Sequence, residues 1–180
     1  GVSYFDGKVG IGTTSPGVKL QVYGSAMPAT GDAASVEDIL TLYRNGSATV
    51  WAGGATLALG RYSSGNGSAP KSRLDFKLKN AAGSNTALPE TTVMTLQSSG
   101  YVGIGTTLPG TKLHVGTGSG ATVDTGYQAV IDSAGIAGLQ ILSSTSHSGR
   151  IVFGDSDDND IGMIKYDHTD NSMGFRTNGS

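Results

Sequence analysis

The chain carries Val9-Gly-Ile-Gly-Thr-Thr-Ser-Pro-Gly-Val-Lys-Leu-Gln-Val22 and, 93 residues later, Val102-Gly-Ile-Gly-Thr-Thr-Leu-Pro-Gly-Thr-Lys-Leu-His-Val115. Eleven of the fourteen positions are identical, and the differences are Ser15/Leu108, Val18/Thr111 and Gln21/His114. An internal repeat of this length indicates a modular chain built from similar units. It favours a tandemly built protein over one organised around a single catalytic pocket.

The likeness between the units extends beyond this motif. Three further pairs match in outline: Ile39-Leu-Thr-Leu42 with Gly138-Leu-Gln-Ile141, Ser72-Arg-Leu-Asp-Phe-Lys77 with Gly149-Arg-Ile-Val-Phe-Gly154, and Met94-Thr-Leu-Gln-Ser-Ser-Gly100 with Met173-Gly-Phe-Arg-Thr-Asn-Gly179. We therefore expect residues 1–8 to end a preceding repeat, 9–101 to form repeat unit one and 102–180 repeat unit two. The sequence reads as a fragment of a longer chain.

Composition excludes several classes of function. The 180 residues include 12 basic and 14 acidic side chains, so there is no polycationic surface for nucleic acid. Cysteine is absent, which excludes disulfides and thiolate metal sites. The sequence contains no run of eighteen apolar residues, so it predicts no membrane-spanning helix. We expect no cofactor.

The apolar residues are mostly small or β-branched and occur in short runs among 29 glycines. Such a chain buries little apolar area, whereas ordering its backbone costs about 1–2 kcal/mol per residue. Oligomerisation is one remedy for a core that is too thin. We therefore expect other copies of the chain to supply the missing burial.

Period-two alternation of apolar and polar residues predicts β-strands, most clearly over residues 74–78. Residues 35–43 fit either a helix capped by Ser35 or a strand. We expect a strand, because Ile39-Leu-Thr-Leu-Tyr43 is rich in residues that favour sheets. The predicted fold class is all-β, repetitive and elongated, with short strands, hairpins and little or no helix.

The repeated glycines predict a structural role for the motif. Alternation in Val9-Gly10-Ile11-Gly12 and in Val102-Gly103-Ile104-Gly105 leaves one strand face without side chains, so another backbone can approach it closely. We expect these eight residues to form the joint of the repeat and to pack in an oligomer. A phosphate-binding loop is not indicated, because no Gly-Lys-Ser/Thr follows.

Asp155, Asp157 and Asn159 lie in the densest acidic cluster and supply oxygen atoms at alternate positions, as a calcium loop would. The sixth position of that loop is Asp160 instead of glycine, and the twelfth is Tyr166 instead of glutamate. A solvated turn between two strands explains the same residues, and we favour the turn.

The only tryptophan, Trp51, lies in an insertion over residues 44–62 that the second unit lacks. We expect an added hairpin there, turning at Gly53-Gly54. Aromatic side chains often stack on sugars, so Trp51 and Tyr62 are candidate receptor contacts. The alternative is that Trp51 fills the local core of the hairpin, since a large aromatic contributes much apolar burial.

The motif Val-Gly-Ile-Gly-Thr-Thr-x-Pro followed by Lys-Leu-x-Val resembles a repeat common in bacteriophage tail-fibre and tail-spike proteins and related phage appendages. Residues 93–105 and 161–175 also resemble segments of those proteins. The resemblance implies an intertwined homotrimeric shaft of β-structure that forms or positions the host-recognition end of a virion. The partners implied by the resemblance are further copies of the chain, other tail or fibre proteins and a host cell-surface glycan. The expected location is the virion or another extracellular appendage.

Two alternatives remain open. Bacterial surface adhesins and filament subunits carry similar strings, and some tail spikes are polysaccharide depolymerases. We do not expect an enzyme, because no Gly-x-Ser-x-Gly nucleophile motif is present. In addition, His114 is replaced by Gln21 in the other copy, which argues against a role as a general base.

Overall fold

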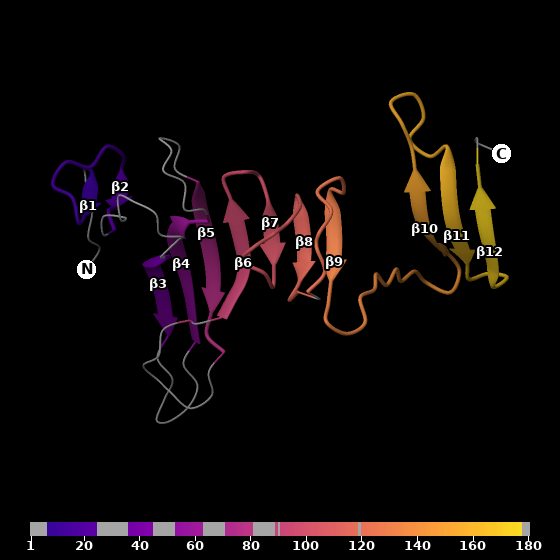
Figure 1. The fold of residues 1–180 in the computed structure, drawn as a ribbon, viewed down its shortest axis with the longest axis horizontal. Coiled ribbons are helices and arrows are strands. Elements are labelled where there is room, and N and C mark those ends of the chain that lie inside the picture. The colour runs from indigo at the N-terminus through magenta and orange to yellow at the C-terminus, as the bar shows by residue number, and fades with distance from the viewer. Residues whose placement is uncertain are drawn as a thin grey trace. The chain divides into compact units, whose positions relative to one another are not determined.

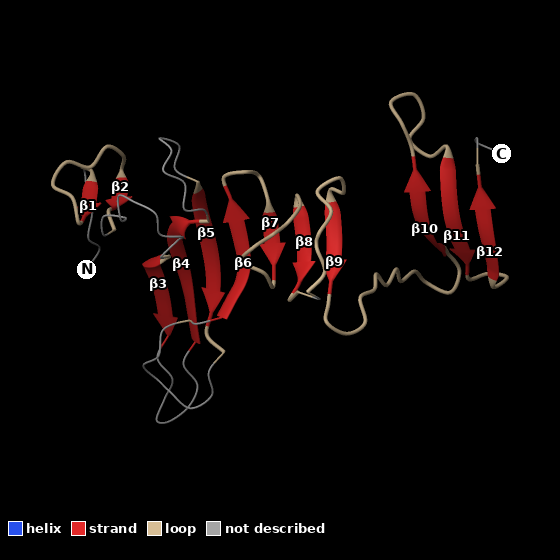
Figure 2. Ribbon diagram, viewed as in Figure 1, coloured by secondary structure: helices blue, strands red, loops and turns tan. Residues whose placement is uncertain are grey.

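The computed structural model describes residues 7–24, 36–44, 53–62, 71–80, 89, 91–118 and 120–177. Twelve strands and no helix occur in these ranges, which confirms the all-β fold class (Figure 2). The segment that fitted either a helix or a strand is a strand, β3 (Glu37–Arg44). The chain divides into two compact units, residues 1–137 and 138–180.

The first unit contains two sheets (Figure 1). A small parallel sheet pairs β1 (Val9–Ile11) with β2 (Leu20–Val22). The larger sheet has seven strands in chain order: β3, β4 (Gly53–Arg61), β5 (Ser72–Leu78), β6 (Thr91–Gln97), β7 (Val102–Ile104), β8 (Leu113–Gly116) and β9 (Ala129–Asp132). Pairing is antiparallel from β3 to β7 and parallel from β7 to β9.

The hairpin expected from the sequence does not turn where it was predicted to, and the expected repeat boundary falls within one sheet. The hairpin does not turn at Gly53-Gly54, because these glycines pair with Arg44 and Tyr43 as the first residues of β4. The residues that connect β3 to β4, 45–52, lie outside the described part of the chain. The start of the second repeat also lies inside one sheet, since β6 pairs directly with β7. Repeat units and compact units therefore do not coincide.

Register gives the seven-stranded sheet two chemically distinct faces. One face, here called the apolar face, carries a row that crosses all seven strands: Leu40, Leu57, Phe76, Met94, Ile104, Val115 and Ile131. The opposite face, here called the polar face, carries the row Asp38, Ala58, Asp75, Thr95, Gly103, His114 and Val130. Period-two alternation produces this separation, with register shifts between Asp38 and Leu40 and between Phe76 and Lys77.

Burial on the two faces is the reverse of the usual arrangement. On the polar face Asp75 is 1% exposed and Thr95 is fully buried. On the apolar face Leu42 is 67% exposed, and Leu40, Leu59 and Leu78 are also exposed. The sheet therefore encloses its polar side chains and leaves its apolar face open within the single chain.

The enclosed polar groups find partners within the sheet. The Arg73 guanidinium lies 2.6 Å from the Asp75 carboxylate, and the Thr95 hydroxyl donates to the same carboxylate at 2.7 Å. Lys77 makes an ion pair of 2.7 Å with Asp38 across two strands. Buried polar groups are tolerated when they are hydrogen-bonded in this way.

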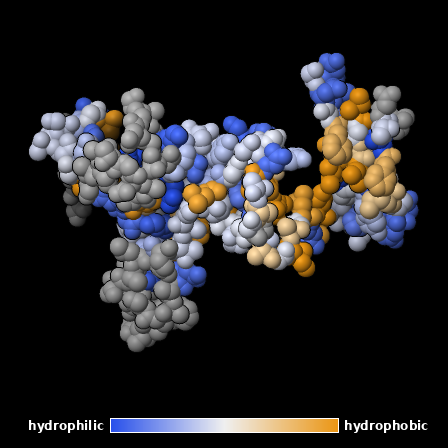
Figure 3. Space-filling view, viewed as in Figure 1, coloured by the Kyte–Doolittle hydropathy of each residue, from blue (hydrophilic) through white to orange (hydrophobic). Residues whose placement is uncertain are grey.

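The second unit is an antiparallel sheet of β10 (Ser148–Phe153), β11 (Gly162–Asp167) and β12 (Ser172–Arg176). Register places six apolar or aromatic side chains on one face: Ile151, Phe153, Ile164, Tyr166, Met173 and Phe175. Phe175 is 76% exposed, and hydrophobic residues gather visibly over this sheet in Figure 3. This sheet also leaves an apolar face open.

Candidate functional site: the repeated glycine arch

Both copies of the motif fold into the same local structure. In each, the Val-Gly-Ile strand and the Leu-x-Val strand are parallel partners, with Val9 opposite Leu20 and Val102 opposite Leu113. Only eight residues, 12–19 and 105–112, connect them. Parallel neighbours usually need a crossover of about a dozen residues or more, so this connection is tight. We call it the glycine arch.

Glycine makes so short an arch sterically feasible. A Cβ atom at Gly10 or Gly103 would lie against the carbonyl oxygen of Thr13 or Thr106, closer than real Cβ atoms approach a backbone. The expected close approach to the bare strand face is therefore present in both copies. The approaching backbone belongs to the chain's own arch.

The next glycine of each motif has a different constraint. Gly12 has a φ of 74° and Gly105 a φ of 76°, in the left-handed region that side chains with a Cβ rarely adopt. These residues turn the chain out of the first strand. Backbone conformation thus requires glycine at these positions, and a Cβ atom at Gly12 would in addition lie against the carbonyl oxygen of Tyr23.

Hydrogen bonds close both arches in the same pattern. The backbone amide of Gly17 donates to Gln21 Oε1 at 2.8 Å, and that of Gly110 donates to His114 Nδ1 at 3.3 Å. The variable position of Lys-Leu-x-Val therefore supplies a side-chain acceptor in each copy. Sequence comparison alone missed this role, because Gln and His share little except an acceptor atom at a similar reach.

The second arch is more enclosed than the first because β9 extends its sheet. His114 is buried, and its Nε2 atom lies 3.5 Å from a carboxylate oxygen of Asp132 on β9. Thr111 is also buried and donates to the backbone carbonyl of Tyr127. Nothing in the sequence linked residue 114 to residue 132, since parallel pairing of β8 with β9 brings them together.

The acidic cluster forms the connection between β10 and β11. Asp155 Oδ1 accepts hydrogen bonds from the backbone amides of Asp157 and Asp158 at 2.9 and 3.0 Å, and these bonds hold the pKa of Asp155 below its ordinary value. Asn159 backbone atoms pack closely against Gly154. The described residues contain no cluster of three or more acidic, histidine or cysteine side chains placed to hold a metal ion. Asp155 thus has a defined role in the turn.

Of the two candidate receptor contacts, the structure describes Tyr62. Trp51 lies outside the described residues. Tyr62 is half-buried, and its backbone amide donates to the carbonyl of Lys71 at 3.0 Å. The receptor-contact assignment remains a prediction.

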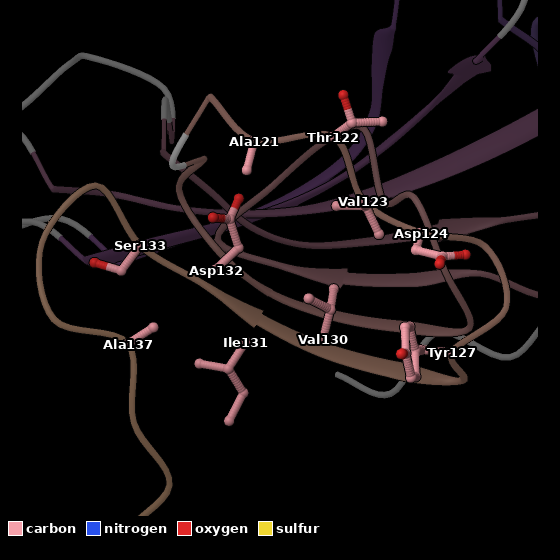
Figure 4. A pocket seen from close by; sticks show the side chains of 10 residues that line it. All are labelled: Ala121, Thr122, Val123, Asp124, Tyr127, Val130, Ile131, Asp132, Ser133 and Ala137. Carbon is pink, nitrogen blue, oxygen red and sulfur yellow. The ribbon is translucent and has the colours of Figure 1, made fainter.

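A shallow cavity of about 360 Å³ lies beside β9 (Figure 4). Its lining residues are Ala121, Thr122, Val123, Asp124, Tyr127, Val130, Ile131, Asp132, Ser133 and Ala137. The Asp124 carboxylate already accepts from the amide of Gly126 at 2.8 Å, and the Asp132 carboxylate lies next to His114. Its two acids therefore already have partners in the chain.

Comparison with known protein families, curated proteins and solved structures finds no match to this chain. Within the described ranges, no helix has the length and apolar character required to cross a membrane.

Proposed function

We propose that this chain is a structural segment of a bacteriophage tail fibre or related appendage, assembled from three copies and contributing to host attachment. The main observation in support is the reversed burial of the seven-stranded sheet, in which Asp75 and Thr95 are buried and Leu42 is exposed to solvent. A second copy of the same chain is the occupant that best fits the open faces.

The size of the open faces supports an obligate assembly. Burying a leucine or phenylalanine side chain that is otherwise exposed contributes about 1.5–3 kcal/mol. The apolar face carries leucine, isoleucine, valine, methionine or phenylalanine on every strand of its seven-residue row. Exposed apolar patches of this kind mark interaction sites, and homo-oligomer interfaces are the more apolar class.

Both units have a sheet with one exposed apolar face, and this shared feature supports a second copy of the chain as the partner. Sheet β10–β12 and the seven-stranded sheet each expose one apolar face, exemplified by Phe175 and Leu42. A second copy offers both faces in the same chain order. Packing between copies repeated around a rotation axis closes into a ring, which accommodates the trimer implied by the resemblance.

Assembly is tested by native mass measurement of the purified chain. We expect about three copies for the unmodified protein. Leu42→Asp and Phe175→Asp should lower the assembled fraction, because each places a charge on an open apolar face. Leu108→Asp is the matched control, since Leu108 is exposed on an arch where the first copy has Ser15. A stable, well-folded monomer would contradict the proposal.

The location is tested with antibodies raised against the purified segment. Labelling of virion tails in electron micrographs is the expected result, and labelling confined to cell surfaces would instead favour an adhesin or filament subunit. Host attachment predicts that the assembly competes with virions for adsorption to cells and binds their surface glycan.

The proposed role includes no catalytic step. Incubation with host capsule or lipopolysaccharide should release no reducing ends. Release that disappears in Asp157→Ala or Asp160→Ala would contradict this part of the proposal and favour a depolymerase.

A further inference from the structure

The start of the second unit contains an apolar segment without a strand partner. Residues 138–142, Gly-Leu-Gln-Ile-Leu, form no strand in the described structure. Leu139 is 72% exposed and Leu142 is 80% exposed. Two large apolar side chains in water on so short a segment indicate that it has a partner in the assembled protein.

The corresponding segment of the first unit lies in a strand that pairs with a neighbour. Ile39-Leu-Thr-Leu42, which matches Gly138-Leu-Gln-Ile141 in the repeat, lies in β3 and pairs with β4 over residues 40–42. β4 in turn pairs with β5, whose sequence matches β10. The second unit has no counterpart of β4 between its apolar segment and β10. Its apolar segment is therefore a strand-forming sequence left without a neighbour.

β10 offers a place for such a strand. In the order β10-β11-β12, one edge of β10 pairs with β11, and no described strand pairs with its other edge. An unpaired edge presents a row of backbone donors and acceptors that another strand can complete. The five residues of 138–142 are one fewer than the six of β10, so a strand of this length would cover most of the edge.

In the described structure, the chain's own residues 138–142 make no backbone hydrogen bond to this edge. A turn brings the His147 amide to the Ser144 carbonyl at 3.0 Å, and the Ser144 hydroxyl lies 2.7 Å from His147 Nδ1. The segment before this turn places the Ile141 side chain next to Gly149, on the apolar face of the sheet. The outer edge of β10 therefore has no strand partner within the described chain.

We propose that residues 138–142 of one copy add as a strand to the free edge of β10 in a second copy, so that neighbouring chains exchange strands. This inference rests on the proposed homo-oligomer and names one of its contacts. Exchange of an identical element is a low-cost route to assembly, because each copy gives and receives the same strand.

The experiment combines photo-crosslinking with isotope labelling. A photoreactive phenylalanine derivative replaces Leu139 in unlabelled chains, which are unfolded together with ¹⁵N-labelled unmodified chains, refolded and irradiated. We expect crosslinked peptides that join the unlabelled residue 139 to ¹⁵N-labelled residues 148–153. The same derivative at Leu108, an exposed arch position, is the control and should give no product with β10.

Hydrogen exchange gives a second readout on the unmodified assembly. Amides of residues 139–142 should exchange more slowly than those of the exposed tip 155–160 by a factor on the order of 100, as expected for a paired strand. Residues 40–42, paired in β3, serve as the internal reference.

The outcomes separate this inference from the proposed function. Products confined to unlabelled chains at every mixing ratio would indicate an intrachain hairpin and overturn the exchange, as would rapid exchange of residues 139–142. An assembly of about three copies with either result would leave the proposed oligomer intact. A native mass of one chain would overturn both.

Discussion

His114 accepts a hydrogen bond at Nδ1 from the backbone amide of Gly110, at 3.3 Å. In the first copy Gln21 makes the equivalent bond to Gly17, at 2.8 Å. Two different side chains therefore close the same arch with an acceptor atom. The variable position of the motif therefore requires a side chain with a hydrogen-bond acceptor. This requirement becomes visible only when the two copies are compared.

The first prediction separates the acceptor from the rest of the His114 side chain. His114→Gln should retain the arch and its stability, because glutamine serves as the acceptor in the first copy. His114→Ala should lower the free energy of unfolding by about 1 kcal/mol or more, because the partly buried amide of Gly110 loses its acceptor. Denaturant unfolding measures both. Equal losses in the two variants would show that the contact with Asp132 matters more than the bond to Gly110.

The second prediction concerns the close approach at Gly103. Gly103→Ala should destabilise the protein by about 1–3 kcal/mol or more. The added methyl group would clash with the carbonyl oxygen of Thr106, and the eight-residue arch is too short to move aside. Gly53→Ala is the matched control in a strand, since no atom lies within 4 Å of a Cβ atom placed there. It should be neutral or slightly stabilising. Thermal melting of the assembly compares the two, and equal tolerance would contradict this account of the arch.

The third prediction concerns the enclosed ion pair. Asp75→Ala removes the carboxylate that pairs with Arg73 and accepts from Thr95, so a guanidinium is left without its charge partner. Loss of one member of a buried pair typically costs about 3–5 kcal/mol. Asp160→Ala breaks the exposed pair with Arg176 and should change stability little. Similar unfolding curves for the two variants would mean that the polar face is not enclosed in solution.

The fourth prediction is a dependence of stability on acid. Hydrogen bonds from the Thr169 hydroxyl and backbone amide and from Lys165 lower the pKa of Asp167 to about 2, from an ordinary value of 3.8. The folded protein therefore binds this proton less readily than the unfolded chain does. The resulting stabilisation is complete above the ordinary pKa and is lost as the pH falls through the folded value.

We therefore expect stability to fall between about pH 4 and about pH 2, measured by denaturant unfolding across this range. Asp167→Asn should reduce the slope. Asp155 and Asp160 also have pKa values below the ordinary range, held there by backbone amides and by Arg176 respectively, so a smaller slope should remain in that variant. An unchanged slope would show that Asp167 does not contribute to the acid sensitivity.

Local patterns predicted the strands well because each depends on few residues. The alternation in residues 74–78 predicted β5, and the β-prone run at residues 39–43 predicted β3 over a helix. The hairpin turn was misplaced at Gly53-Gly54, because a pair of glycines is a turn signal that also fits the start of a strand. Pairing with Arg44, which a local pattern does not contain, decided between them.

The sequence by itself determined the all-β class, the repeat and the glycines of the arch, since these follow from period-two alternation and from the steric freedom of residues without a Cβ. Only the tertiary structure decided that the polar face is enclosed, that Asp132 meets His114 and that the bare glycine face meets its own arch. Burial and proximity depend on which strands become neighbours. That choice is made by pairing between residues distant in the chain, which no local spacing records.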